Sequence, residues 1–282
     1  MRLIFCGCKG TMFFLYTKIL RQLFFANGSY FVILSLFDTK KMLIKTKAIV
    51  LRAFKYGESQ LIVDTLTESH GRLSFILRIP KTGRSRIRKQ LFQPMSVLLI
   101  EMDYRQRQRL QKIREATMAY PLSSLPFDAR KLTIALFLAE FTLACTRVEQ
   151  QDAPLFAFVE NSVRWLDAAE GAFANFHIIY ILRFSQFVGF YPNLEDGAEG
   201  DFFDLRDGCY TATVPLHPDF LRPEEANKIR LLMRLSYNTM HLLALTRTER
   251  NQIVETIIKY YSLHVPDFPE LRSLSVLREL FS

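Results

Sequence analysis

Five short segments in the first half of the chain alternate apolar and polar residues with a period of two. They read MLIKTKAIVLRAF at 42–54, QLIVDTLTES at 60–69, RLSFILRI at 72–79, PMSVLLIEMDY at 94–104 and LQKIREATMAY at 110–120. This alternation and the many β-branched residues predict half-buried strands. Five strands in one stretch predict a five-stranded Greek-key barrel of the OB type, with a small open sheet as the alternative.

Beyond Pro121 the apolar residues recur at helical spacing instead. Helices are expected within 127–148 (starting near Asp128), 153–171 (ending at Gly171), 173–191, 223–245 (opened by Pro223), 250–265 (after a capping box of Thr246 and Glu249) and 271–280. The segment 173–191 is apolar on most sides, which is typical of the central helix of a bundle. Residues 191–222 are rich in Asp, Glu, Gly and Pro and are expected to be irregular. The fold class is therefore α+β, with a barrel domain at 42–120 and a helical bundle domain at 121–282.

The first 41 residues differ from the rest. The stretch QLFFANGSYFVILSLF at 22–37 is uncharged and apolar, but it is shorter than a membrane span and contains Asn27-Gly28-Ser29. It could be a signal sequence or anchor, or an accessory helix. We favour a third interpretation, in which Met42 is the true start and residues 1–41 are a non-native extension or are disordered, because Met42 immediately precedes a clear strand pattern.

Charge is distributed unevenly along the chain. Residues 43–120 hold 16 Lys and Arg against 6 Asp and Glu, a balance of +10, whereas residues 121–282 hold 15 against 21, a balance of −6. A basic domain beside an acidic one predicts a polyanion as partner of the first and another partner for the second. The four cysteines are too few and too scattered for a disulfide framework, which favours reduced thiols in the cytoplasm.

Two arginine rows with a period of two stand out in the basic half. PKTGRSRIRK at 80–89 and YRQRQRL at 104–110 fall in connections between predicted strands. OB barrels bind single strands through the loops between strands 1 and 2 and between strands 4 and 5, and alternate cations in extended chain could follow a phosphate backbone. Phe54, Tyr56, Phe75, Phe92 and Tyr104 are candidates for base stacking. The predicted DNA-binding residues are Lys45, Lys47, Arg52, Lys55, Lys81, Arg84, Arg86, Arg88, Lys89, Arg105, Arg107 and Arg109.

Motifs for nucleotide or zinc chemistry are absent. The sequence has no GxxxxGK[ST] and no GxGxxG, and its five histidines form no HExxH pair. The carboxylates in NLEDGAEGDFFDLRDG at 193–208 could hold Mg²⁺ in a nuclease, although a glycine-rich acidic loop is usually just solvated. A metal-dependent nuclease using the 195–207 carboxylates and an RNA-binding OB protein therefore remain as alternative functions.

From Met42 onward the chain resembles the RecO family of bacterial recombination mediators. The resemblance rests on AIVLRAFKYGESQLIVDTLTESHGRLSFILRIPKTGRSR and returns at YYSLHVPDFPELRSLSVL near the end. Many members carry a four-cysteine zinc site after a G-x-x-P-x-L segment. Here Gly189, Pro192 and Leu194 are kept but only Cys209 falls where a zinc cysteine would, so we expect no metal.

The resemblance implies a cytoplasmic, non-enzymatic DNA-repair mediator without cofactor, associated with the nucleoid during repair. Such proteins bind single- and double-stranded DNA, anneal complementary strands and, with RecR, load RecA onto DNA coated by the single-strand-binding protein. They also bind the acidic, aromatic tail of that protein, which should require an apolar pocket beside cations of the helical domain. The candidate cations are Arg130, Lys131, Arg147, Arg164 and Arg183.

Overall fold

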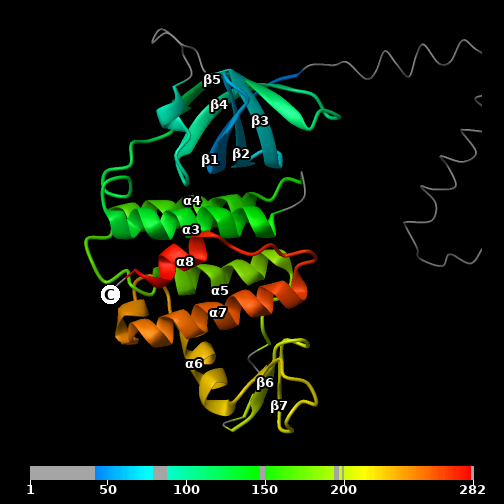
Figure 1. The fold of residues 1–282 in the computed structure, drawn as a ribbon, viewed down its shortest axis with the longest axis vertical. Coiled ribbons are helices and arrows are strands. Elements are labelled where there is room, and N and C mark those ends of the chain that lie inside the picture. Colours follow the sequence, from blue (N-terminus) through cyan, green and yellow to red (C-terminus); the bar gives the residue numbers. More distant parts are fainter. Residues whose placement is uncertain (1–41, 79–87, 147–149, 194–196, 199, 281–282) are drawn as a thin grey trace, which may run out of the picture.

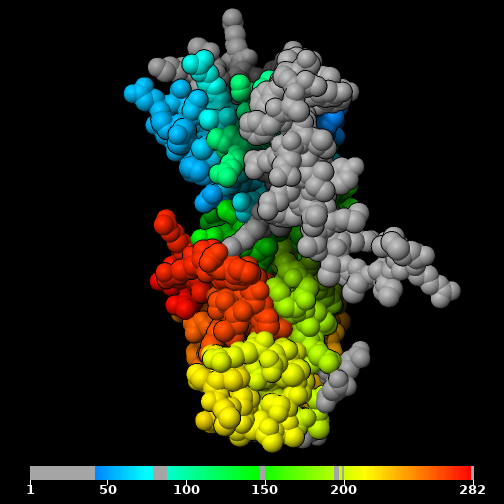
Figure 2. All heavy atoms as spheres, turned by 90° about the vertical axis from the view of Figure 1, so that its right-hand side faces the viewer, coloured from blue at the N-terminus to red at the C-terminus, as the bar shows by residue number. Residues whose placement is uncertain are grey.

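The protein consists of a β barrel, a layer of helices and a small sheet that follow one another along the long axis (Figures 1 and 2). The computed structural model describes residues 42–78, 88–146, 150–193, 197–198 and 200–280. Among these residues no helix is both long and apolar enough to cross a membrane. The segment 1–41, about which three interpretations compete, lies outside the described residues.

The five predicted strands form a closed barrel in the order β1-β2-β3-β5-β4, as expected for an OB-type fold; the open sheet is wrong. Antiparallel pairs make most of the wall, and a short parallel contact between β3 and β5 closes it. The strands are β1 (Met42–Tyr56), β2 (Gln60–Thr67), β3 (Gly71–Arg78), β4 (Val97–Tyr104) and β5 (Leu110–Met118), with the 3₁₀ turn η2 (Lys89–Leu91) before β4.

Strand β1 is long enough to take part in both halves of the barrel. Its first half pairs with β4 and its second half with β2, and the register slips by one residue between Val50 and Arg52. A bulge of this kind bends the strand and reverses which alternate residues point outward. Lys45 and Lys47 point outward before the bulge, whereas Arg52 and Phe54 do so after it.

The barrel interior is filled by alternate residues of each strand. A compact apolar cluster includes Val63, Phe75, Leu98 and Ile100, all nearly or fully buried. Phe75 and Phe92 belong to this cluster, so these two predicted stacking candidates are core residues. The alternation of the sequence therefore reports the barrel interior correctly.

A different set of barrel residues belongs to the core of the helical half. Ile49, Leu51, Leu66, Met95 and Val97 pack in the same cluster as the helices. The two halves also approach closely at Gly71, whose φ is +64° and where a Cβ would lie 2.1 Å from the Gln150 carbonyl oxygen. Only glycine fits a left-handed position with backbone so near. The barrel and the helices thus form one continuous folded unit.

The helices that the sequence marks by a capping residue or a proline begin as predicted, and every helix ends before its predicted segment does. The side chain of Asp128 accepts hydrogen bonds from the first turn of its helix, and Thr246 with Glu249 forms the expected capping box. The helices are α3 (Ala129–Cys145), α4 (Ala153–Ala168), α5 (Phe176–Val188), α6 (Pro223–Arg234), α7 (Arg247–His264) and α8 (Ser273–Arg278), with the 3₁₀ turn η3 (Met240–Leu242).

Glycine does not end α4 as predicted. The helix stops at Ala168, before Gly171, and the residue with positive φ beyond it is Ala172 at 58°. Helix α6 ends at Arg234 because Leu235 is extended, and the rest of the predicted segment forms a turn and η3. By contrast α5 is the central helix as expected: it contacts α3, α4, α6 and α7, and most of its residues are buried.

Residues 191–222 are not merely irregular, which corrects the prediction. They contain a three-stranded antiparallel sheet in the order β7-β6-β8, made of β6 (Phe202–Asp204), β7 (Cys209–Thr211) and β8 (Phe220–Leu221). Glycine, proline and acidic residues concealed strands that are only two or three residues long. The sheet lies at the end of the molecule opposite the barrel (Figure 1).

Candidate nucleic-acid interface

The outer surface of β1, β2 and β3 near their shared hairpin carries aromatic, apolar and cationic residues in rows. The strand registers place Tyr56, Gln60 and Arg78 in one row, and Phe54, Ile62 and Ile76 in the next. We call the surface formed by these six residues and Arg52 the hairpin face. Tyr56 is 55% exposed and Phe54 39%, while Ile62 and Ile76 are half-buried. This is an exposed apolar strip with cations at its sides.

Arg52 orients the aromatic part of the hairpin face. Its guanidinium lies 5.0 Å from the centre of the Phe54 ring and pairs with the buried Asp64 at 2.7 Å. The hydroxyl of Ser74 donates to the other Asp64 oxygen at 2.6 Å. Because Asp64 offsets its charge, Arg52 acts mainly by holding the Phe54 ring against the sheet.

Arg78 is the cation at the other edge of this face. It ends β3, is exposed, and forms no ion pair within the part of the chain that the structure describes. Sequence reasoning noted Arg78 only as a neighbour of the arginine rows. The alternation of β3 could have identified it, because every second residue of this strand is buried and Arg78 is one of the residues between them that point outward.

The second arginine row lies in a tight turn and not in extended chain. Arg105, Arg107 and Arg109 are exposed in the connection between β4 and β5. The buried Gln111 fastens this turn, because its amide donates to the carbonyls of Arg105 and Gln108 and accepts from the Arg105 amide. The spacing of two residues therefore does not align these arginines along an extended strand. The three cations do lie together on one exposed turn.

Because β3 and β5 run parallel, this turn lies at the start of β3, at the end away from Arg78 and the hairpin face. Leu110 lies opposite Ser74, while Arg78 stands four residues further along β3, or about 13 Å at the usual strand rise. The two predicted binding loops thus flank the outer surface of β2 and β3. The ring of Tyr104 lies tilted against His70 at the β2–β3 turn, with the ring centres 4.4 Å apart.

Of the first arginine row only the last two cations are described. Arg88 is extended and exposed, and Lys89 begins η2. Lys81, Arg84 and Arg86 lie outside the described residues.

The remaining barrel lysines are not on the hairpin face. Lys45 lies on the outer surface formed by β1 and β4, where it pairs with Glu101 at 3.2 Å. Lys55 pairs with the buried Leu61 and therefore lies on the opposite surface of the hairpin from Phe54, where it is exposed. Lys45 and Lys55 therefore lie apart from the other predicted DNA-binding residues of the hairpin face.

Lys47 links the barrel to the helices through an ion pair. Its ammonium donates to both carboxylate oxygens of the buried Glu160 on α4, at 3.1 and 3.0 Å. Glu160 also pairs with Arg164, whose guanidinium lies 3.9 Å from the centre of the Tyr120 ring. Burial, aided by Glu160, raises the pKa of Tyr120 to about 12. Lys47 and Arg164 thus serve the junction, which argues against the predicted contacts of Lys47 with DNA and of Arg164 with a partner.

The other partner-binding candidates are also engaged within the molecule. The ammonium of Lys131 is buried and donates to the Ser124 hydroxyl and to the carbonyls of Asp167 and Ala169. Arg130 is exposed but pairs with Asp128 at 3.2 Å and lies over the Phe173 ring. Arg183 donates to the Leu235 carbonyl at 2.9 Å. Arg147 lies outside the described residues.

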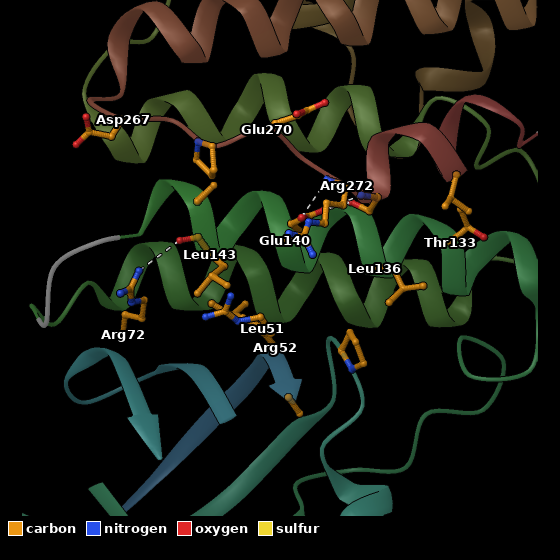
Figure 3. A pocket seen from close by; sticks show the side chains of 16 residues that line it. Leu51, Arg52, Arg72, Thr133, Leu136, Glu140, Leu143, Asp267, Glu270 and Arg272 are labelled. Atoms are coloured by element: carbon orange, nitrogen blue, oxygen red, sulfur yellow. Dashed lines mark hydrogen bonds between the residues drawn. The ribbon is translucent and has the colours of Figure 1, made fainter. Parts of the chain in front are cut away.

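A groove of about 900 Å³ between the barrel and the helices better matches the predicted pocket for an acidic tail. Figure 3 shows it between the middle of β1, the outer side of α3 and the segment around α8. Leu136 and Val276 are exposed in it. Sequence reasoning missed it because its lining comes from five segments that are far apart in the chain.

Three arginines border this interdomain groove. Arg72 reaches from the barrel to the end of α3, where it donates to the carbonyl of Leu143, and Arg52 enters from β1 (Figure 3). Arg72 also donates to the Thr146 carbonyl at 2.8 Å. Arg272 is exposed and forms no ion pair among the residues described. Glu140, also in the groove, is satisfied by the backbone amides of Arg272 and Ser273.

The described carboxylates of the acidic segment stabilise the small sheet. Asp204 accepts hydrogen bonds from the Arg206 and Asp207 amides and from His217 at 3.0 Å. Asp219 pairs with Lys259 and Arg206, and these hydrogen bonds lower the pKa of its carboxyl. Glu195, Asp196 and Glu199 lie outside the described residues.

A zinc site does not fit the described residues of this sheet. No three His, Cys, Asp or Glu side chains gather as metal ligands within the described ranges. Burial, with Asp207 and Asp204 nearby, raises the pKa of the Cys209 thiol, whereas a zinc ligand must be a thiolate. Ion pairs and hydrogen bonds among the described residues hold this small sheet.

Comparison with known proteins agrees with this architecture. Residues 42–122 match the family described as "Recombination protein O N terminal", and residues 126–274 match "Recombination protein O C terminal". The chain belongs to the RecO family. It is 48% identical over 241 residues to the DNA repair protein RecO of Phocaeicola vulgatus, and 44% identical over 241 residues to that of Bacteroides fragilis. These alignments cover 86% and 85% of this chain and all of each relative.

A more distant relative extends the same result. The DNA repair protein RecO of Flavobacterium psychrophilum is 34% identical over 243 residues, which are 86% of this chain and all of the relative. Membership of the RecO family indicates a function in DNA repair and recombination. The family resemblance expected from the sequence is therefore confirmed.

Proposed function

We propose that the protein is a non-enzymatic mediator of DNA repair and homologous recombination. It binds single- and double-stranded DNA, anneals complementary strands and, with RecR, helps to load RecA onto DNA coated by the single-strand-binding protein. It does so in the cytoplasm, at the nucleoid during repair, and without a cofactor. The observation that carries the proposal is the hairpin face, which joins exposed aromatic rings to cations on an OB barrel.

Single-stranded DNA would bind along β2 and β3. Unpaired bases stack on Phe54 and Tyr56, with the flat apolar surface of Ile62 and Ile76 beneath them. Phosphates meet Arg78 on one side and the arginines of the β4–β5 turn on the other. Stacking tolerates any base, which suits a protein that must act on any damaged sequence.

Stacking and phosphate binding can be separated experimentally. The double variant Phe54→Ala/Tyr56→Ala should weaken binding of an oligothymidylate by about tenfold to a thousandfold, since each stacked base contributes about 1–3 kcal/mol. Its log–log salt slope should stay unchanged because every cation is kept. Tyr191→Ala, a similarly exposed tyrosine in the helical half, is the control. A wild-type affinity in the double variant would remove the hairpin face from the interface.

We further propose that the tail of the single-strand-binding protein docks in the interdomain groove. An acidic peptide with an aromatic end needs an apolar surface beside cations, and Leu136 and Val276 lie there with Arg272. Val276→Asp and Arg272→Glu should each abolish binding of a tail peptide in a calorimetric titration. Arg278→Glu, exposed on the same short helix, is the control. Tail binding that survives both changes would exclude the groove.

Incubation of labelled strands with Mg²⁺ or Mn²⁺ tests the nuclease alternative. The mediator should leave strands intact and pair complementary ones, whereas a nuclease would shorten them. Competition between DNA and RNA of one sequence tests the translation-related alternative. Comparable affinity for both would keep the RNA-binding alternative open, and a preference for RNA would favour it, because recognition through the 2′-hydroxyl distinguishes the two.

A further inference from the structure

A second outer surface of the barrel, formed by β1, β4 and β5, has a different composition. The registers place Leu43, Lys45, Leu99, Glu101, Glu115 and Thr117 on it, and we call it the glutamate face. Leu99 is 48% exposed and Leu43 53%. A groove of about 460 Å³ crosses this face and is also lined by Lys47 and Glu68. It therefore combines exposed leucines with carboxylates.

The two cations that line the groove are already paired, whereas two of its carboxylates are not. The exposed Lys112 lies outside the groove, in the row of Leu43. Lys45 pairs with Glu101 and Lys47 with Glu160. Glu68 and Glu115 are exposed and form no ion pair within the described ranges. The groove thus presents negative charge to solvent.

One cross-strand pair brings two like charges together, and Lys45 offsets only one of them. Glu101 and Glu115 lie directly opposite each other on neighbouring antiparallel strands. Like charges in this arrangement destabilise a sheet. A cation supplied from outside would relieve the repulsion.

The chemistry of this surface excludes several kinds of ligand. Carboxylates repel DNA, and no metal-ligand group is found among the residues described. The middle strand of this face, β4, is paired with β1 on one side and β5 on the other along its length, so a peptide cannot add to it as a further strand. Recognition must use side chains, with cations for Glu68 and Glu115 and an apolar group for Leu99.

We propose that the glutamate face docks a basic segment of a partner protein. Lysine or arginine side chains of that segment pair with Glu68 and Glu115, and an apolar side chain covers Leu99. Charge complementarity and exposed leucine together select this occupant. The site uses the first half of β1, whereas the hairpin face uses the second half, so partner and DNA occupy the barrel together.

A fluorescent twelve-residue peptide of lysine, leucine and serine is the probe, with a matched peptide carrying glutamate in place of lysine. Anisotropy at low ionic strength should show binding of the basic peptide only. Glu68→Gln/Glu115→Gln should weaken it by about tenfold, since each partly exposed charge pair contributes up to about 1 kcal/mol. Leu99→Ser should weaken it as well, which an unspecific ionic attraction would not show. A photoreactive peptide should crosslink to β4 or β5.

The control is Glu170→Gln/Glu279→Gln, which removes two exposed glutamates of the helical half that also have no ion pair among the residues described. It should bind the basic peptide like the wild type. Unchanged affinity in the Glu68/Glu115 double variant or in Leu99→Ser would overturn the proposal. So would sedimentation showing that the wild type self-associates through this face and the double variant does not. Each variant should keep wild-type affinity for DNA, so failure of DNA binding in the wild type would count only against the proposed function.

Discussion

Strand β1 contributes to two outer surfaces of the barrel, the hairpin face and the glutamate face. Both have exposed apolar side chains bordered by charge, but the charges have opposite signs. On the hairpin face Asp64 is buried beneath Arg52, and Arg78 has no ion pair among the described residues. On the glutamate face the lysines that line the groove are paired, and Glu68 and Glu115 have no ion pair within the same ranges. The excess of positive charge in the barrel domain is therefore unevenly distributed around the barrel. The face on which a residue lies decides which partner it can contact.

The largest expected effect concerns the first arginine row. Replacing Lys81, Arg84, Arg86, Arg88 and Lys89 together by alanine should flatten the log–log salt slope of single-strand binding by about 3.5, at about 0.7 for each phosphate that is no longer neutralised. The weakening should be nearly independent of DNA sequence, because phosphate binding carries no base information. Binding of the basic peptide to the glutamate face should not change. A wild-type slope would mean that the row is only solvated.

The β4–β5 turn should give a smaller effect of the same kind. Changing Arg105, Arg107 and Arg109 to alanine should reduce the slope by about 2 on the same basis. The melting temperature should hold, because Gln111 fastens the turn through backbone groups. Titrations at several salt concentrations and a thermal melt measure both quantities. A reduced affinity with an unchanged slope would contradict phosphate binding by this turn.

One cation from each face tests the comparison directly. Arg78→Gln should lower the salt slope by about 0.7, whereas Lys45→Gln should leave it unchanged. The reason is that Arg78 lies beside the stacking residues without an ion pair in the described part of the chain, while Lys45 is neutralised by Glu101 in the other sector. If the two variants weaken binding equally, the barrel binds DNA all round and the division into faces is wrong.

The smallest expected effect is on stability. Glu115→Lys replaces a like-charge pair with Glu101 by an opposite-charge pair, which should raise the free energy of unfolding by about 0.5 kcal/mol. Denaturant unfolding of this variant and of Glu170→Lys, where no glutamate lies opposite on a strand, measures the difference. Equal stability of the two would show that Glu101 and Glu115 do not repel each other.

The period of the sequence predicted the strands well because a small closed barrel has a distinct inside. Val63, Phe75 and Leu98 fill that interior and set the alternation. Helix starts were equally accessible, since Asp128, Pro223 and Thr246 act on the turn that follows them. These features are local and need no knowledge of the fold.

The site was less accessible because it depends on register and on distant partners. The one-residue slip in β1 decides that Phe54 points outward, and no local pattern announces it. Lys47 and Lys131 look like surface cations until Glu160 and the Ser124 hydroxyl lie beside them. The small sheet was missed because its strands are too short for any period to appear. Arg78 and Arg272 became visible only in the folded chain.

Some apolar residues of the barrel are part of the core of the helical half, and this limits how the barrel can be separated from the helices. The two family matches meet between residues 122 and 126, which invites cutting the chain there. A barrel cut at that point would expose Ile49, Leu51, Leu66, Met95 and Val97 to water and would aggregate. Transplanting it onto another protein requires polar replacements at these five positions first. At the boundary visible in the sequence the chain passes from the barrel to the helices without leaving their common core. The unit that can be moved intact is therefore the barrel together with the helices.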